Sequence, residues 1–145
     1  MEFRGVGKEI HALSNLLGRK IEAEKRQHGM QDITPVQTWV LRYLHVHKNK
    51  EVFQRDLEQE FSITRSTVTG ILKLMEKNGL ISRRGVPEDA RLKKLTLTQK
   101  GEEMEEAVRS HMERTEKCLT KGLSEEEVQT FLELVGRIRS NLETQ

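Results

Sequence analysis

The sequence predicts a mostly α-helical fold with one small β-hairpin. Apolar residues recur at spacings of three and four along both ends of the 145-residue chain, which is typical of amphipathic helices. Between residues 80 and 97 the apolar period shortens to two, which is typical of strands. Ser or Thr caps and Gly stops divide the helical part into separate helices. Together these observations favour a helical chain interrupted by a single two-stranded ribbon.

The first predicted helix covers residues 3–28 and carries a narrow apolar stripe. Gly29 provides its natural end, because glycine readily adopts the left-handed conformation that closes many helices. A stripe this narrow is typical of a helix–helix seam rather than of a wide face that packs on a core. Its members are Ile10, Leu13, Leu17 and Ile21.

The second predicted helix begins with a capping box. Thr34 can cap it, Pro35 occupies its first position, and Gln37 can reach back to the capping amide. This helix continues to about residue 48, and a short extended piece is expected at residues 51–53.

Two further helices are predicted over residues 54–61 and 64–77, with Asn78-Gly79 ending the second. Two helices joined by a turn of about three or four residues form a helix-turn-helix arrangement. The second helix has apolar residues on one side and small or basic residues on the other, and its diameter of ~10 to 12 Å fits a major groove ~12 Å wide. The alternative is an ordinary amphipathic helix whose small residues face water.

The outward face of this helix supplies candidate DNA contacts. Arg65 can donate two hydrogen bonds to guanine, whereas Lys73 and Lys77 suit phosphates. The candidate residues of the helix are Arg65, Ser66, Thr67, Thr69, Gly70, Lys73 and Lys77.

The predicted hairpin has strands at residues 80–84 and 92–97 around a turn at 85–90. Its cations are too close in sequence to pack in a core, so water or anions must satisfy them. Asp89 lies two residues from Arg91 and can direct that guanidinium toward a narrow minor groove. The alternative is a surface ion pair worth ~0 to 1 kcal/mol. The candidate DNA contacts here are Arg83, Arg84, Asp89, Arg91 and Lys93, with Lys94 beside them.

Two helices are expected after the hairpin. Thr98 can cap a long one that reaches about residue 121 and ends at Gly122, and Ser124 with Glu127 forms a capping box for the last. The last helix repeats an apolar stripe, made of Val128, Leu132, Val135, Ile138 and Leu142. We expect both terminal stripes to pair across a two-fold axis with a second copy, the alternative being packing within one chain.

The charge is concentrated in the middle of the chain. The whole chain has a net charge of only +2, but residues 62–101 carry nine Lys and Arg against three Asp and Glu, a net +6. Residues 102–145 carry six against eleven, a net −5. The positive charge therefore lies where a phosphate backbone can use it.

Several other classes of protein lack support in the sequence. No apolar run approaches the ~18 residues of a membrane span, and no signal peptide is recognisable, so a cytoplasmic protein is expected. No phosphate loop, nucleophile elbow or cofactor motif is present, so no enzyme or cofactor is expected. The five histidines offer no pair at helical metal spacing, so no metal site is expected: His11, His28, His45, His47 and His111.

Three further side chains allow two interpretations. Cys118 lies within an apolar-striped helix, which favours a buried, inert thiol over an oxidant sensor. Trp39 and Tyr43, one turn apart, are expected in the core, with an effector pocket as the alternative.

The order of these features resembles the multiple-antibiotic-resistance regulator (MarR) family of winged-helix proteins. The resemblance is carried by the 64–77 helix, Asn78-Gly79, the strand with Arg83, Asp89-x-Arg91 and Leu97-Thr98-x-x-Gly101. It implies a winged helix-turn-helix at residues 33–100, flanked by dimerisation helices at 1–32 and 101–145. Glu58 departs from the small residue that is common at its position.

The resemblance also implies a function. It implies a homodimeric transcriptional regulator, expected to be a repressor, that binds a pseudo-palindromic DNA site and is released by a small-molecule effector. In the family the helix matching 64–77 enters the major groove and the arginine matching Arg91 enters the minor groove. The alternative is a winged-helix adaptor that binds another protein and does not bind DNA specifically.

Overall fold

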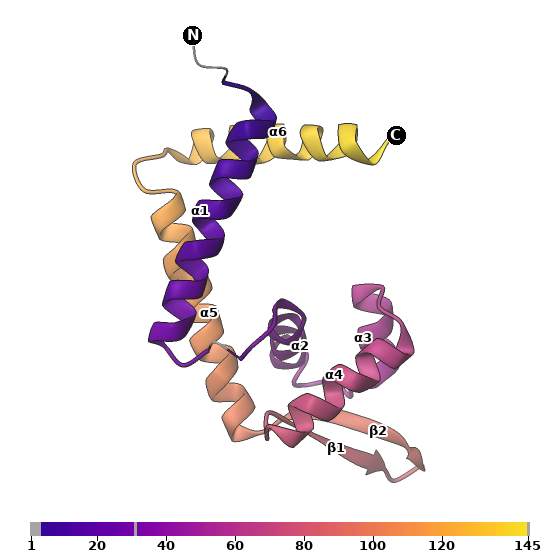
Figure 1. The fold of residues 1–145 in the computed structure, drawn as a ribbon. Helices are drawn as coiled ribbons and strands as arrows, with labels where there is room; N and C mark the ends of the chain where they lie inside the picture. Colours follow the sequence, from indigo (N-terminus) through magenta and orange to yellow (C-terminus); the bar gives the residue numbers. More distant parts are fainter. Residues whose placement is uncertain (1–3, 31, 145) are drawn as a thin grey trace. The chain divides into compact units, whose positions relative to one another are not determined.

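The structure is a computed structural model that describes residues 4–30 and 32–144 (Figure 1). The elements of these residues follow in the order α1 (Val6–Gln27), α2 (Pro35–Val46), α3 (Gln54–Phe61), α4 (Arg65–Lys77), β1 (Ile81–Val86), β2 (Asp89–Leu97), α5 (Gln99–Leu119) and α6 (Glu125–Glu143). The mostly helical fold with one hairpin is therefore confirmed. Residue 3, where the first helix was expected to begin, lies outside the described part.

The chain forms two compact units, Met1–Ser110 and His111–Gln145. The first contains α1 to α4, the hairpin and the beginning of α5, and the second contains the rest of α5 and α6.

The hydrophobic core of the first unit lies among α2, α3, α4 and the hairpin. Leu57, Leu72 and Met75 are completely buried, so α3 and α4 meet through their apolar faces. α4 also contacts β1, which places the hairpin directly beside this helix (Figure 1). The buried cluster consists of Ile33, Val40, Leu41, Leu44, Val52, Leu57, Val68, Leu72, Met75, Leu80, Ile81 and Leu95.

Local signals fix the helix boundaries. The amide of Gln37 donates to Oγ1 of Thr34 (3.2 Å), and the Thr34 amide donates to Oε1 of Gln37 (3.2 Å). The same reciprocal pair forms between Ser124 and Glu127 at the start of α6. Both predicted capping boxes are confirmed.

The hairpin is longer than predicted because its register shifts near the tip. Ile81 pairs with Leu97 and Gly85 with Lys93, but Val86 pairs with Asp89, so three extra residues lie on β2. This irregular pairing hides the period of two that marks the rest of β2. The predicted turn at 85–90 is reduced to two residues between the strands. Residues 51–53 form no strand, although the amide of Leu95 donates to the carbonyl of Val52 (2.8 Å).

A close approach joins the beginning of α5 to the end of α4. Thr98 Oγ1 donates to the carbonyl of Gly79, and Lys100 Nζ donates to the carbonyl of Asn78 (2.8 Å). A Cβ on Gly101 would lie 2.0 Å from the carbonyl oxygen of Leu80, so only glycine fits there. The Leu-Thr-x-x-Gly segment therefore holds α4, β1 and α5 together.

Two expectations about buried side chains are wrong. Cys118 is exposed, because the apolar stripe on which it lies is itself exposed at this end of α5, with Leu119 also at the surface. Trp39 is 49% exposed and packs one face against Phe61, with ring centroids 5.9 Å apart. Helical spacing predicted a face for each residue but not whether that face is covered.

Candidate nucleic-acid interface

The helix-turn-helix is held rigidly by its own turn. Ser62 ends α3 in the left-handed conformation (φ 51°), and the amide of Ile63 donates to the carbonyl of Glu58 (3.2 Å). Glu58 is only partly buried, so this larger side chain fits beside the turn. Gln54 of α3 donates to Oγ1 of Thr69 (2.8 Å), which fixes the N-terminal turns of α4 against α3.

The outward face of α4 contains most of the residues that the sequence predicted there. Six are exposed: Arg65, Ser66, Thr67, Gly70, Lys73 and Lys77. Thr69 differs from them, since it is partly buried and its hydroxyl donates to the carbonyl of Arg65 (2.9 Å) while it accepts from Gln54. Thr69 therefore supports α4 from within the protein, a role that its position on the helix did not indicate.

Arg91 is a highly accessible cation of the hairpin. Its side chain is 93% exposed and lies in the segment where the register shifts, next to the tip. Asp89 accepts a hydrogen bond from the amide of Arg91 (2.9 Å) through Oδ1, and the same oxygen lies 3.4 Å from Nε. The Asp89 carboxylate thus holds both backbone and guanidinium, as the spacing of the two residues predicted.

Arg83 has a different environment from the other arginines. Its Nε and Nη2 donate to the two carboxylate oxygens of Glu76, at 3.3 and 3.1 Å. These hydrogen bonds from Arg83 hold the pKa of Glu76 below its usual range. The pair connects the last turn of α4 to β1, so Arg83 orients the hairpin relative to the helix. Sequence reasoning missed Glu76 as the partner, because the two residues lie on different elements.

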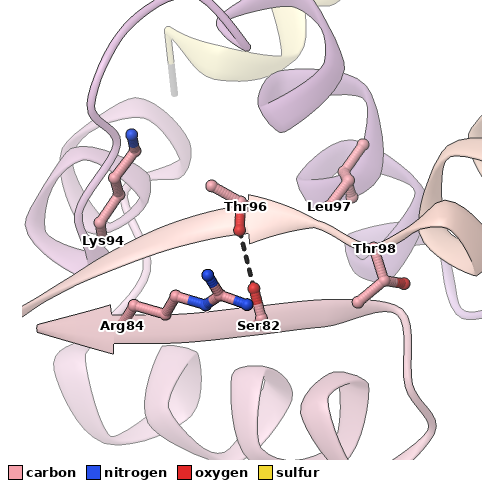
Figure 2. Close-up of a pocket in the computed structure, with 6 residues that line it drawn as sticks. All are labelled: Ser82, Arg84, Lys94, Thr96, Leu97 and Thr98. Carbon is pink, nitrogen blue, oxygen red and sulfur yellow. Dashed lines mark hydrogen bonds between the residues drawn. The ribbon is translucent and has the colours of Figure 1, made fainter.

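The outer face of the hairpin carries a shallow basic hollow of about 390 Å³ (Figure 2). Ser82 and Thr96 lie opposite each other and share a hydrogen bond of 2.8 Å. Arg84 and Lys94 are also directly opposite, and like charges in this position destabilise a strand pair unless an anion or water lies between them. Lys93, opposite Gly85, is exposed as well. The hairpin therefore presents cations both at its tip and along its outer face.

Aromatic rings from the end of α2 pack against the end of α3. Tyr43 stacks on His47 with ring centroids 4.1 Å apart and meets the edge of Phe61 at 5.9 Å. Burial raises the pKa of Tyr43 above its usual value. Tyr43 and Phe61 are partly buried and pack against the hydrophobic core cluster.

The terminal helices leave their apolar stripes uncovered in a single chain. Neither α1 nor α6 has a buried residue in its described part. Exposed members of the predicted stripes are Ile10, Leu13, Leu132 and Leu142, and partly buried ones are Leu17, Ile21, Val128, Val135 and Ile138. Sequence analysis missed four more exposed residues, Val6, Leu16, Phe131 and Leu134, which widen both stripes. Their spacing of three and four from the predicted members was the available signal.

Together, the exposed face of α4 and the basic hairpin beside it define a winged helix-turn-helix protein. The profile of the MarR family matches residues 31–92, from before α2 into the second strand of the hairpin. The chain is also 34% identical to the transcription regulator MarR from Oenococcus oeni PSU-1, with 94% of this chain and 99% of that one covered and a TM-score of 0.63. The chain belongs to the MarR family of transcriptional regulators.

Two other relatives agree with this assignment. The HTH-type transcriptional regulator YdgJ of Bacillus subtilis is 35% identical over 92 residues, which are 63% of this chain and 56% of that protein. The S. aureus MepR–DNA complex has a TM-score of 0.74 at 28% identity, covering 97% of this chain and 99% of that one. None of the helices in the described residues is long and apolar enough to span a membrane.

Proposed function

We propose that the protein is a homodimeric, sequence-specific DNA-binding regulator that represses transcription from a pseudo-palindromic site. The observation that carries the proposal is the pairing of an exposed polar face on α4 with the almost fully exposed Arg91, in one unit whose parts are fixed to each other. The resemblance to MepR in its complex with DNA supports the same use of the fold.

In this proposal α4 lies in the major groove. Arg65 at its first turn reads a guanine through two hydrogen bonds, with Ser66 and Thr67 beside it on bases or phosphates. Lys73 and Lys77 lie about two and three turns further along than Arg65 and bind phosphates, which fix the register. Gly70 has no atom within 4 Å of the position of a Cβ, so its absent side chain lets the helix backbone approach the groove.

The wing reaches the neighbouring minor groove. Arg91, directed by Asp89, enters it, since narrow minor grooves attract arginine through their negative potential. Arg84, Lys93 and Lys94 bind the adjacent phosphates, which explains why two cations face each other across the strands.

The dimer is formed by the flanking segments, residues 1–32 and 101–145, around the DNA-binding region at 33–100. The uncovered apolar stripes of α1 and α6 supply the contact, and each aliphatic side chain that becomes fully buried contributes ~1.5 to 3 kcal/mol before entropy losses. A two-fold axis then fixes the separation of the two α4 helices, which suits DNA half-sites ~34 to 36 Å apart.

Binding of a small-molecule effector releases the DNA. In this role the protein acts in the cytoplasm and catalyses no reaction. A screen for compounds that displace a bound operator fragment identifies the effector class.

Selection of bound sequences from a random DNA pool tests the proposal. A two-fold symmetric consensus is expected, together with a loss of about 10³-fold or more in affinity between about 50 and 200 mM salt if six or more phosphates are contacted. A protein-interaction adaptor would instead enrich no sequence and show a weak salt dependence. That result, or a monomer at micromolar concentration, contradicts the proposal.

A further inference from the structure

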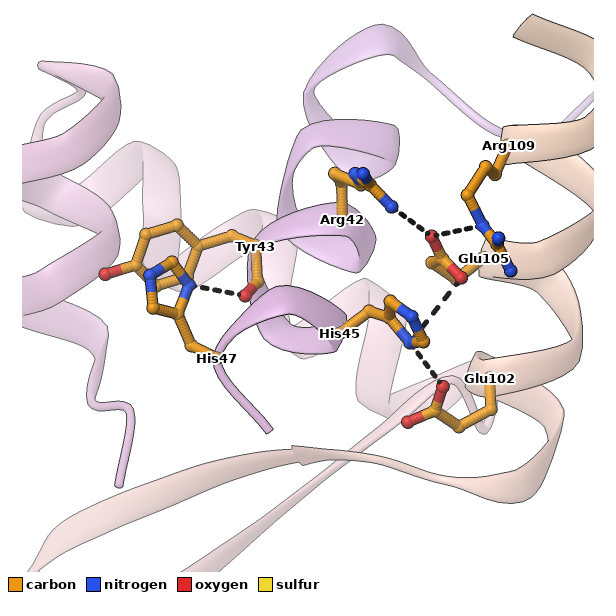
Figure 3. A network of polar contacts seen from close by, with 7 residues as sticks. All are labelled: Arg42, Tyr43, His45, His47, Glu102, Glu105 and Arg109. Carbon is orange, nitrogen blue, oxygen red and sulfur yellow. Dashed lines mark hydrogen bonds and ion pairs between the residues drawn. The ribbon is translucent and has the colours of Figure 1, made fainter. Parts of the chain in front are cut away.

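A second polar cluster lies away from the DNA-binding face, between α2 and the beginning of α5 (Figure 3). Nδ1 of His45 is 2.9 Å from Oε2 of Glu102 and 3.6 Å from Oε2 of Glu105. All three ligand atoms lie within 4.8 Å of one another. We propose that His45, Glu102 and Glu105 bind one divalent first-row transition-metal ion, with Zn²⁺ as the reference ion.

The buried carboxylate is the observation that points to a ligand. Glu105 is only 2% exposed, and its Oε2 makes no hydrogen bond within the described part of the chain. A buried carboxylate oxygen without a donor is costly, and a cation bound to it removes that cost. Figure 3 shows this oxygen directed toward the His45 ring rather than toward the two arginines.

The distances match those in a metal site. Zn²⁺ binds His nitrogen and carboxylate oxygen at about 2.0 to 2.2 Å, so two ligands at a tetrahedral angle stand roughly 3.4 Å apart. The nitrogen of His45 lies 2.9 and 3.6 Å from the two oxygens, on either side of that value. The ligand atoms all lie within 4.8 Å of one another, so an ion fits once the two carboxylates turn toward it. Imidazole with carboxylates is a ligand set for ions of the Zn²⁺ and Mn²⁺ class.

The surroundings of the cluster supply both support and an entrance. Arg42 Nη1 donates to Oε1 of Glu105 (3.2 Å), and Nε of Arg109 lies 3.4 Å from the same oxygen. Both arginines orient this carboxylate through the oxygen that the ion does not use. Glu102 is partly exposed, so solvent reaches the cluster from its side.

The arginines also limit the affinity. Their two positive charges balance those of the two glutamates, so the cluster without an ion is close to neutral when His45 is neutral. The cluster should therefore bind a metal ion with lower affinity than a triad of one histidine and two carboxylates that has no arginines beside it. We expect metal to bind with micromolar rather than nanomolar affinity.

The proposal is tested on the full chain after treatment with a chelator. Zn²⁺ is titrated against a chromophoric competitor, and Co²⁺ is added separately because its visible absorption reports nitrogen and oxygen ligands. The wild type should bind one ion per chain, and Zn²⁺ should raise its melting temperature. His45→Gln and Glu102→Gln should each lower the affinity at least about 10-fold, since they remove ligands rather than outer partners.

Two matched variants control for the loss of a histidine or a carboxylate. His47 is two residues from His45, at the C-cap of the same helix, and its Nδ1 bonds to the carbonyl of Tyr43 (2.8 Å) instead. Glu103 is exposed and lies beside Glu102 on α5. His47→Gln and Glu103→Gln should bind like the wild type. The proposal is overturned if the wild type shows no saturable metal binding, or if His45→Gln and Glu102→Gln bind metal as tightly as the wild type. Neither measurement depends on DNA binding.

Discussion

Replacing Gly101 by alanine should destabilise the protein by about 1.5 to 4.5 kcal/mol. The added Cβ would lie 2.0 Å from the oxygen of Leu80, 3.0 Å from its carbonyl carbon and 3.2 Å from Cδ2 of Leu97. Ordinary contacts begin near 3.4 Å, so the backbone of Leu80 must move by more than 1 Å. That movement stretches the bond in which the amide of Thr98 donates to Leu80 (3.1 Å).

The magnitude combines two effects. Overpacking costs about 1 to 3 kcal/mol, and a weakened internal hydrogen bond adds about 0.5 to 1.5 kcal/mol. Urea unfolding followed by circular dichroism measures the change as a lower midpoint with an unchanged slope.

Gly136→Ala in α6 is the matched control. The position of its Cβ has no atom within 4 Å, so a helical alanine there should stabilise by about 0.5 to 1 kcal/mol. If Gly101→Ala unfolded within about 0.5 kcal/mol of the wild type, the close approach of α5 to Leu80 would be refuted.

Three further predictions concern the helix, the wing and the link between them. Arg91→Ala should weaken operator binding strongly without changing the sedimentation of the dimer, because its side chain makes contacts only near the tip; unchanged affinity in a gel-shift titration would exclude the minor-groove role. Arg65→Ala should cost ~1 to 3 kcal/mol and relax the preference at one base pair in a binding-site selection, whereas a uniform loss would place Arg65 on phosphate. Glu76→Gln should destabilise the protein near neutral pH. Since Arg83 lowers the folded pKa of Glu76 from its ordinary value of 4.5, the contribution is present above 4.5 and is lost as pH falls through the lowered pKa. Unfolding curves of the variant and the wild type should converge in acid, and a constant difference would contradict the argument.

Most of the fold could be predicted because its signals are local. The capping residues Thr34 and Ser124, and the glycines that follow helices, act within a few residues of their own position. Amphipathic spacing likewise identified the outward face of α4, because a helix has one period. The hairpin tip was predicted less well, since the register shift between Gly85 and Val86 depends on pairing with a distant strand.

The parts that could not be predicted are contacts between elements. From the sequence, Arg83 is indistinguishable from the other cations of the hairpin. In the structure β1 lies beside the last turn of α4, and the Arg83 guanidinium donates to the Glu76 carboxylate. His45 lies 57 residues from Glu102, so no spacing rule for metal ligands can connect them. Trp39 and Cys118 show the same difficulty for burial, which depends on what covers a helix face.

The junction at Gly101 has a mechanical consequence. α5 is one continuous helix that begins in the first unit and ends in the second, and its first turn is bonded to the carbonyls of Asn78 and Gly79 at the end of α4. Because Gly101 packs directly against the carbonyl of Leu80, this contact leaves little room for α5 to move relative to α4. A tilt imposed on the start of α5 must therefore carry the end of α4 with it and turn the exposed face of that helix.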